Sequence, residues 1–269
     1  MNLLKVVFQD LRIFYSYNLV ICYNNINHFY LQELYMKKNK IIITGGNGRF
    51  ATTLKKSKLN LNFLFPSKNQ LNILNISSIK NFIKKHKPKY LLHCAALSRP
   101  MDIHDTFISK SIDINIIGTA NVVKVCSEFN VKLIYFSTGY VYPGLKGNYK
   151  ELDAVLPINN YAWSKLGGEC AVTMYKNSLI LRIIMCEKPF LHKKAFYDIE
   201  TNFIYHDEVI KMLPKILDKK GIINIGGKTQ SVYDFAKKTN KNIKKISGKK
   251  VFPPKPSMNI SKLKKILKW

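Results

Sequence analysis

Short apolar runs alternate with helical patterns along most of this chain. Runs rich in β-branched and aromatic residues occur at 40–44, 62–65, 90–96, 132–136, 179–184 and 221–226. Segments with helical periodicity follow several of them, at about 108–128, 206–217 and 231–238. Buried strands that alternate with amphipathic helices are typical of a parallel sheet covered on both faces. The pattern therefore predicts an α/β fold with a doubly wound parallel sheet of the Rossmann type, in which ligands bind at the carboxyl ends of the strands.

Residues 1–35 do not continue this pattern. The apolar run at 13–22 is too short to span a membrane as a helix, and no small-residue cleavage site follows it. Met36, by contrast, is followed by a few polar residues and then directly by the first predicted strand. We expect translation to begin at Met36, with residues 1–35 a non-native or disordered extension. The alternative is an amphipathic anchor.

A glycine-rich loop directly follows the first strand. It reads Gly45-Gly46-Asn47-Gly48-Arg49-Phe50-Ala51 and opens a predicted helix. Glycines in this position let the backbone turn tightly and approach a pyrophosphate, which then lies on the helix N-terminus. The small Ala51 lets the helix pack close to the strand. The strand, loop and helix together indicate a dinucleotide site.

The end of the second predicted strand indicates which dinucleotide. An NAD-binding unit usually carries an acidic residue there to hold the ribose 2′-hydroxyl. Here the sequence is Pro66-Ser67-Lys68, and no Asp or Glu occurs from residue 34 to residue 101. Together with Arg49, Lys68 favours a 2′-phosphate, so we expect NADP(H) rather than NAD(H). The alternative is that this lysine-rich stretch is only solvated surface.

The stretch 157–165 contains Tyr161 and Lys165, four residues apart. On a helix these two side chains lie on one face. A nearby cation lowers the pKa of a phenol from its usual value near ~10, which makes a general acid or base for a carbonyl or alcohol. Thr138 falls at the carboxyl end of the fourth strand and can offer a hydroxyl to a substrate carbonyl. Taken singly, the Tyr–Lys pair is more simply an aromatic and a lysine sharing a helix, and Thr138 more simply structural.

Composition narrows the function classes. The net charge is +28, but only four of the 44 basic residues are arginines and the lysines are spread along the chain. Readers of bases and phosphates usually rely on arginine, so we attribute the charge to codon usage and expect no nucleic-acid partner. The five cysteines are odd in number and lack Cys-x-x-Cys spacing, which favours a reduced, cytoplasmic protein. The six histidines have no metal-ligand spacing, and we expect no metal and no membrane association.

Several motifs in order resemble the extended short-chain dehydrogenase/reductase family, in particular its dTDP-4-dehydrorhamnose reductase-like branch of sugar-nucleotide reductases. The resemblance covers residues 36 to about 240. The stretches that carry it are Thr-Gly-Gly-Asn-Gly-Arg-Phe-Ala at 44–51, His-Cys-Ala-Ala at 93–96, Asn-x-x-Gly-Thr at 115–119, Phe-Ser-Thr-x-Tyr-Val-Tyr at 136–142, Pro-x-Asn-x-Tyr-x-x-x-Lys at 157–165, Leu-x-Gly-Glu at 166–169 and His-Asp at 206–207.

The resemblance implies roles for three residues in catalysis. Tyr161 would protonate the substrate oxygen as hydride arrives, and Lys165 would lower the pKa of Tyr161 and bind the nicotinamide ribose. Thr138 would hydrogen-bond the carbonyl. For the cofactor, the resemblance implies contacts to the pyrophosphate and lining of the site by Gly45, Gly48, Arg49, Phe50, Ala95 and Ala96. Asn115 would order a water in a proton relay or mark a kink in its helix.

As a whole the resemblance implies an NADPH-dependent reductase of a nucleotide-linked 4-keto-6-deoxy sugar, acting in polysaccharide or glycan precursor synthesis, with a homodimer as one assembly left open. The implied organisation is an NADP-binding domain at 36–182 and, at 183–269, a small substrate lobe plus helices that complete the sheet. Three features depart from the reductases: Gly139 stands where they have Asp, Asn72-Ile73 replaces an acidic-Ile pair, and the lobe is short. A sugar-nucleotide epimerase and a non-catalytic NADP-binding regulatory subunit therefore remain alternatives.

Overall fold

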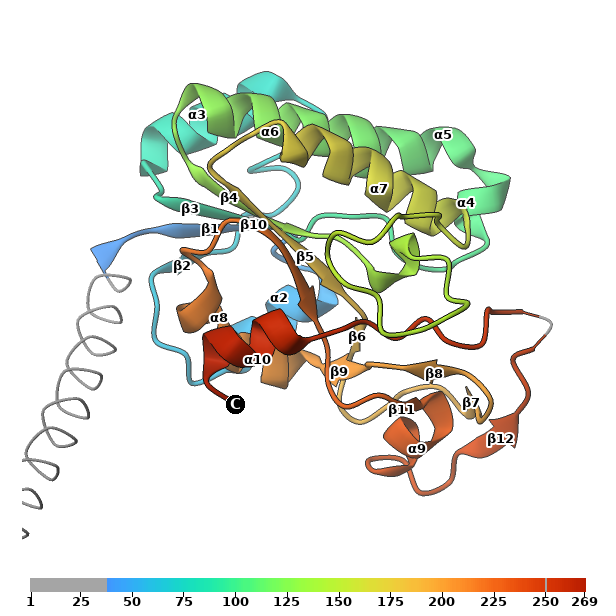
Figure 1. Cartoon of the computed structure of the whole chain (residues 1–269). Helices are drawn as coiled ribbons and strands as arrows, with labels where there is room; N and C mark the ends of the chain where they lie inside the picture. Colours follow the sequence, from blue (N-terminus) through green and yellow to red (C-terminus); the bar gives the residue numbers. More distant parts are fainter. Residues whose placement is uncertain (1–37, 250) are drawn as a thin grey trace, which may run out of the picture.

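A six-stranded parallel sheet forms the centre of the molecule (Figure 1). The computed structural model describes residues 38–249 and 251–269, so the expected start at Met36 and the extension 1–35 lie outside the described residues. In spatial order the strands are β10 (Gly221–Ile225), β5 (Ser178–Ile183), β4 (Lys132–Phe136), β3 (Tyr90–His93), β1 (Ile41–Thr44) and β2 (Phe63–Leu64). The doubly wound parallel sheet predicted from the sequence is confirmed.

The chain runs outward from β1 to β2 and then crosses back to β3 on the other side of β1. Ile41 pairs with Phe63 of β2 on one side and with Tyr90 of β3 on the other. Strand order therefore reverses between β1 and β3. In open α/β sheets, ligands bind outside the carboxyl ends of the strands at such a point.

Helices cover both faces of the sheet (Figure 1). On one face lie α3 (Ile76–His86), α6 (Gly118–Glu128) and α7 (Asn160–Thr173); on the other lie α2 (Arg49–Lys56), α8 (His206–Ile216) and α10 (Ser261–Leu267). One apolar core joins Leu54, Val209 and Leu263 to the sheet, and a second joins Val125 and Val172 to its opposite face. Each helix thus buries one stripe against the strands, as the amphipathic pattern requires.

The long helix expected at 108–128 is helical throughout but not uniform. It consists of α5 (Ile108–Ser111), a π-helical stretch η1 (Ile112–Ile117) and α6, and the short helix α4 (Ile103–Thr106) precedes it. The π-helical stretch contains Asn115, whose side chain is fully buried. π-Helical turns inside α-helices occur frequently at functional sites. Elsewhere the expected elements differ at their ends, since the second strand covers only Phe63–Leu64 and the helix at 231–238 is α9 (Val232–Lys237).

A smaller lobe, at the lower right of Figure 1, is built from paired short strands and α9. Its strands are β6 (Met185–Cys186), β7 (Lys194–Phe196), β8 (Glu200–Thr201), β9 (Ile204–Tyr205), β11 (Gln230–Ser231) and β12 (Lys244–Ile246), paired β6 with β9, β7 with β12 and β8 with β11. Phe190, Ile199, Tyr205 and Phe235 form its apolar cluster. The division of the chain at residue 182 into two domains stays a prediction.

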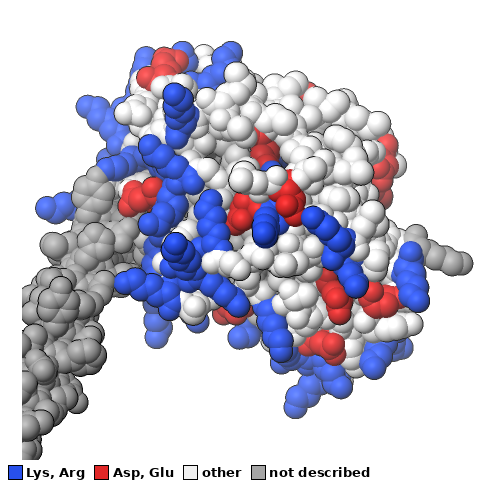
Figure 2. Space-filling model, in the orientation of Figure 1, with Lys and Arg blue, Asp and Glu red and all other residues white. Residues whose placement is uncertain are grey.

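The basic charge is unevenly distributed over the face shown in Figure 2. Lysine and arginine side chains gather on the left and lower parts of this view, whereas few occur at the upper right, where α4 and α5 lie in Figure 1. Lysines such as Lys56, Lys84 and Lys264 are exposed on helices whose other faces pack against the sheet. Within the two described ranges, no helix combines the length and apolarity that crossing a bilayer requires.

Candidate active site

The glycine loop lies where the strand order reverses. Gly45 has a φ of +70°, and a Cβ there would stand 2.9 Å from the Cα of Ala95, just beyond β3. A Cβ on Gly46 would stand 2.7 Å from the carbonyl oxygen of Pro66, just beyond β2. Gly48 directly precedes α2 and offers no side chain to cap it, so the first N–H groups of the helix can face a ligand. The loop is thus a narrow cradle that fits an extended anion such as a pyrophosphate.

Arg49 and Phe50, the first residues of α2, point to different surroundings. Phe50 is 5% exposed and its ring packs on those of Phe136 and His206, so its side chain belongs to the core. Arg49 donates to Glu187 across 2.9 Å, and Arg99 Nη1 lies 3.8 Å from the other oxygen of that carboxylate. Burial alone would raise the pKa of Glu187, but a backbone hydrogen bond and the charges of Arg49 and Arg99 outweigh it and lower the pKa.

The segment after β3 is tied to the sheet and to α7. The backbone N–H of Ala95 donates to Thr44 Oγ1 across 3.2 Å. Asn115 accepts from the N–H of Leu97 at 2.8 Å and donates both to the carbonyl of Leu97 and to Ser164 Oγ, at 2.9 and 2.8 Å. Because Asn115 is fully buried and fully hydrogen-bonded, it holds the backbone beyond Ala96 against the helix of Tyr161.

Tyr161 lies in the first turn of α7. Asn159 caps this helix by accepting from the N–H of Ala162 at 2.9 Å, which fixes where the first turn begins. Thr138 lies two residues beyond β4, and its side chain is near enough to Tyr161 to lower the pKa of that phenol. The structure therefore brings together an acid and a hydroxyl that the sequence placed 23 residues apart.

The pKa of Tyr161 is not lowered, as the spacing of Tyr161 and Lys165 led us to expect, but raised. Burial raises the pKa of Tyr161 to about 12, against the lowering effects of the Thr138 hydrogen bond and of Arg99 and Arg49. The amine of Lys165, the expected partner, lies 4.2 Å from the centre of the Tyr135 ring. Burial also lowers the pKa of Lys165 to about 7, although Cys94 and Glu169 raise it. Desolvation outweighs the pairing that the helical spacing suggested.

A buried ion pair supports this end of the sheet. The guanidinium of Arg182 on β5 and the carboxylate of Glu169 on α7 are in direct contact, with side chains 5% and 3% exposed. Ser137, the residue before Thr138, donates to the other oxygen of Glu169 at 2.7 Å. Tyr142 accepts from Arg182 at 2.8 Å. These bonds connect α7, β4 and β5 on the side of the sheet where Tyr161 and Thr138 meet.

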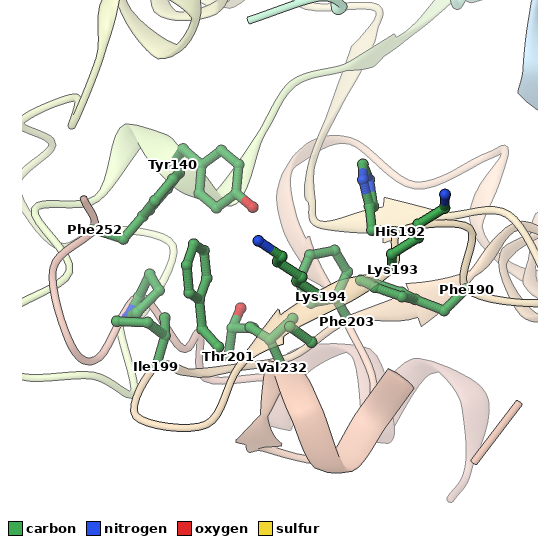
Figure 3. A pocket seen from close by; sticks show the side chains of 13 residues that line it. Tyr140, Phe190, His192, Lys193, Lys194, Ile199, Thr201, Phe203, Val232 and Phe252 are labelled. Carbon is green, nitrogen blue, oxygen red and sulfur yellow. The ribbon is translucent and has the colours of Figure 1, made fainter. Parts of the chain in front are cut away.

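Next to Tyr161 a cavity of about 450 Å³ opens in the smaller lobe (Figure 3). Tyr140 lines this cavity and also lies near Tyr161. Burial and the neighbouring Tyr161 raise the pKa of the Tyr140 hydroxyl. Figure 3 shows that Tyr140 and Lys194 both point their polar ends into the cavity. Thr201 also lines it, and its buried hydroxyl has no hydrogen-bond partner within the described residues. The remaining lining residues are Phe190, His192, Lys193, Ala195, Phe196, Ile199, Phe203, Val232, Phe252 and Pro256.

The residues predicted from the sequence are gathered only in part. The glycine loop, Ala95 and the Tyr161–Thr138 pair occupy the carboxyl edge of the sheet, and Lys68 is exposed just beyond β2. Sequence reasoning missed Arg99 and Glu187. Arg99 carried a usable signal, because it is one of four arginines and follows a strand predicted to be buried. Among the residues that the structure describes, no three His, Cys, Asp or Glu side chains are placed to share a metal ion.

The chain is similar to known proteins of two kinds. It is 27% identical to methionine adenosyltransferase 2 subunit beta of Pongo abelii over 150 residues, 52% of this chain and 45% of that relative, so the match spans less than half of the relative. It is also 27% identical to dTDP-4-dehydrorhamnose reductase of Aggregatibacter actinomycetemcomitans, over 71% of this chain and 63% of that one.

A solved structure shares the fold. The dTDP-4-dehydrorhamnose reductase of Bacillus anthracis, in complex with NADP, superposes with a TM-score of 0.75 at 23% identity, covering 84% of this chain and 92% of that one. The family model described as RmlD substrate binding domain matches residues 39–186, which is more than half of the chain. With its parallel sheet, glycine loop and Tyr161–Lys165 helix, the chain belongs to the RmlD substrate binding domain family within the extended short-chain dehydrogenase/reductase-like proteins.

Proposed function

We propose that this protein is an NADPH-dependent reductase of a nucleotide-linked 4-keto-6-deoxy sugar, acting in the synthesis of polysaccharide or glycan precursors. The observation that carries the proposal is the meeting of Tyr161 with Thr138 at the edge of a cavity that Tyr140 shares. A phenol beside a hydroxyl, one helical turn from a buried amine, is an arrangement suited to giving a proton to a carbonyl oxygen.

The cofactor site of the proposal is built from the glycine loop and the two strand ends beside it. The cradle at Gly45 and Gly46, which side chains would fill, fits a pyrophosphate. Lys68 offers a cation to a 2′-phosphate, since no acidic residue precedes it on β1 or β2. A solved relative holds NADP. When bound, the nicotinamide supplies the hydride.

The chain's own residues supply the proton. Because its pKa is about 12, Tyr161 is protonated at neutral pH, which is the form a general acid needs. Thr138 orients the substrate oxygen, and the phenol of Tyr161 then gives its proton to that oxygen. Arg49 and Arg99 supply positive charge near the phenolate that remains. Asn115 and the Glu169–Arg182 pair keep these groups in place.

The cavity of the smaller lobe suits the nucleotide part of the substrate. Its walls carry several aromatic rings, against which a base can stack. His192, Lys193 and Lys194 line it as well, and two ammonium groups complement the charge of a diphosphate. The unpartnered hydroxyl of Thr201 is available to a polar atom of the ligand.

A second candidate is a non-catalytic NADP-binding regulatory subunit. It is favoured by the relative named methionine adenosyltransferase 2 subunit beta and by the amine of Lys165, which lies on the Tyr135 ring. An epimerase is a third reading, in which the nicotinamide would be restored in each cycle.

One assay separates these candidates. NADPH oxidation is followed with a panel of nucleotide-linked keto sugars, using wild type and Tyr161→Phe. We expect steady oxidation with at least one sugar and its loss in the variant. Tight NADPH binding without oxidation across the panel would favour the regulatory subunit. Conversion of the sugar without net NADPH consumption would favour the epimerase.

A further inference from the structure

His104, in the short helix α4, is a buried histidine that the proposed mechanism does not use. It is 1% exposed, and its Nδ1 lies 2.7 Å from Ser111 Oγ. Its Nε2 has no partner, one of only three such buried side-chain atoms among the described residues. Leaving a buried polar atom unpaired costs stability, so its presence calls for an explanation.

The ring of His104 lies against Tyr161. The two ring centres are 5.1 Å apart and the planes are inclined by 58°. The next residue, Asp105, accepts from the side chain of Asn160 at 2.7 Å. Two consecutive residues of α4 therefore hold two consecutive residues at the start of α7.

The surroundings of His104 bear on which of its two ring nitrogens carries hydrogen. Burial lowers the pKa of His104, against the opposing charge of Asp105, so the imidazole is neutral at pH 7 and only one nitrogen carries hydrogen. When the Ser111 hydroxyl donates to Nδ1, 2.7 Å away, the hydrogen of the neutral ring lies on Nε2. An N–H group directed at an aromatic face is weakly attracted to it.

We propose that His104 carries its hydrogen on Nε2 and is a positioning residue for Tyr161. Its Nε2–H faces the Tyr161 ring, holds that ring where the hydroxyl meets Thr138, and favours the phenolate that forms when the proton leaves. The inference rests on the proposed reductase function, because the phenolate matters only if Tyr161 gives up its proton. It explains why a buried nitrogen lacks an ordinary acceptor at this place.

Two substitutions and a control test the proposal. His104→Phe keeps a ring against Tyr161 but removes both nitrogens. We expect kcat to fall about fivefold, with unchanged KM and NADPH affinity and an unfolding midpoint that is the same or higher. His104→Gln restores an N–H near the position of Nε2 and should recover part of kcat. Asp105→Ala removes the hydrogen bond between α4 and α7 and should leave kcat unchanged.

A second readout does not depend on turnover. In protein with ¹³C-labelled tyrosine rings, the Tyr161 signal is identified by its absence in Tyr161→Phe. His104→Phe should shift this signal and Asp105→Ala should not. An unshifted signal in His104→Phe, or a shift without any loss of kcat, would overturn the proposal. So would equal losses of kcat and stability in both variants, which would mark α4 as merely structural. If wild type reduces no keto sugar, the reductase function fails, while the signal still shows whether the contact exists.

Discussion

Two regions contribute to the candidate site: the carboxyl edge of the sheet and the smaller lobe. They hold their side chains in different ways. At the sheet edge, hydrogen bonds leave little freedom: Thr44 and Thr119 both bond the ring of His93, at 2.7 and 3.0 Å, and Asn115 bonds Leu97 and Ser164. In the lobe, aromatic packing shapes the cavity, and the Thr201 hydroxyl has no hydrogen-bond partner among the residues that the structure describes. The groups that we propose to react are therefore preorganised, whereas the proposed substrate side is defined by the volume of the cavity and a few polar side chains.

Because of this difference, we expect the sheet edge to determine the reaction and the smaller lobe to determine which substrate binds. Volume-conserving changes in a packed aromatic wall usually cost little stability, but breaking a buried polar network costs much more. The lobe can thus change its ligand while the sheet edge keeps its geometry. Each substitution below changes either the sheet edge or the smaller lobe and leaves the other region unchanged.

The largest effect is expected at the sheet edge, on turnover. Tyr161→Phe should lower kcat by about 10²–10⁴-fold, with little change in NADPH affinity or stability, since one hydroxyl is lost. Lys165→Ala should lower kcat and weaken NADPH binding as well. Steady-state kinetics and NADPH fluorescence titration measure both. Full activity in Tyr161→Phe would show that another residue supplies the proton.

The next largest effect concerns stability. Glu169→Gln leaves Arg182 buried and uncompensated, so we expect the free energy of unfolding to fall by about 3–5 kcal/mol, measured by urea titration. The matched control is Glu128→Gln, which breaks the exposed pair of Lys80 and Glu128 and should cost less than about 1 kcal/mol. Equal costs in both variants would show that the buried network does not stiffen this half.

Cofactor choice should respond to a single charge beyond β2. Lys68→Glu should weaken NADPH binding about tenfold and leave NADH binding unchanged or tighter, because only NADPH carries the 2′-phosphate. Lys84→Glu makes the same charge change on α3 and serves as the control. Tighter NADH than NADPH binding by wild type would contradict the assigned preference.

The smallest effect is expected in the lobe. Thr201→Val replaces an unpartnered hydroxyl by a methyl group of similar shape, so the free energy of unfolding should rise by about 1 kcal/mol. The KM for the nucleotide sugar should rise severalfold and the NADPH affinity should stay the same. A loss of stability would mean that the hydroxyl has a partner in solution.

The same contrast explains what the sequence could predict. The sheet, the glycine loop and the Tyr161–Lys165 spacing follow from local patterns of two to seven residues, and they were found. The contacts of Arg49 with Glu187 and of His104 with Tyr161 join segments 138 and 57 residues apart in the chain, and no local pattern signals them. Short strands such as β8 show almost no alternation of apolar and polar residues, so the sequence did not predict the cavity that they line. The raised pKa of Tyr161 depends on burial, which helical spacing alone does not show.

The central claim is that NADPH bound at the sheet edge gives a hydride, and Tyr161 a proton, to a keto sugar whose nucleotide part binds in the lobe. The most direct measurement uses NADPH carrying deuterium at the transferable position of the nicotinamide, with the sugar that gives the highest turnover in the panel. Mass spectrometry of the product then locates the label. The account predicts that the reduced sugar carries the deuterium. It also predicts one molecule of oxidised cofactor for each molecule of reduced sugar. An unlabelled sugar, or NADPH that keeps its deuterium with every substrate, would contradict it.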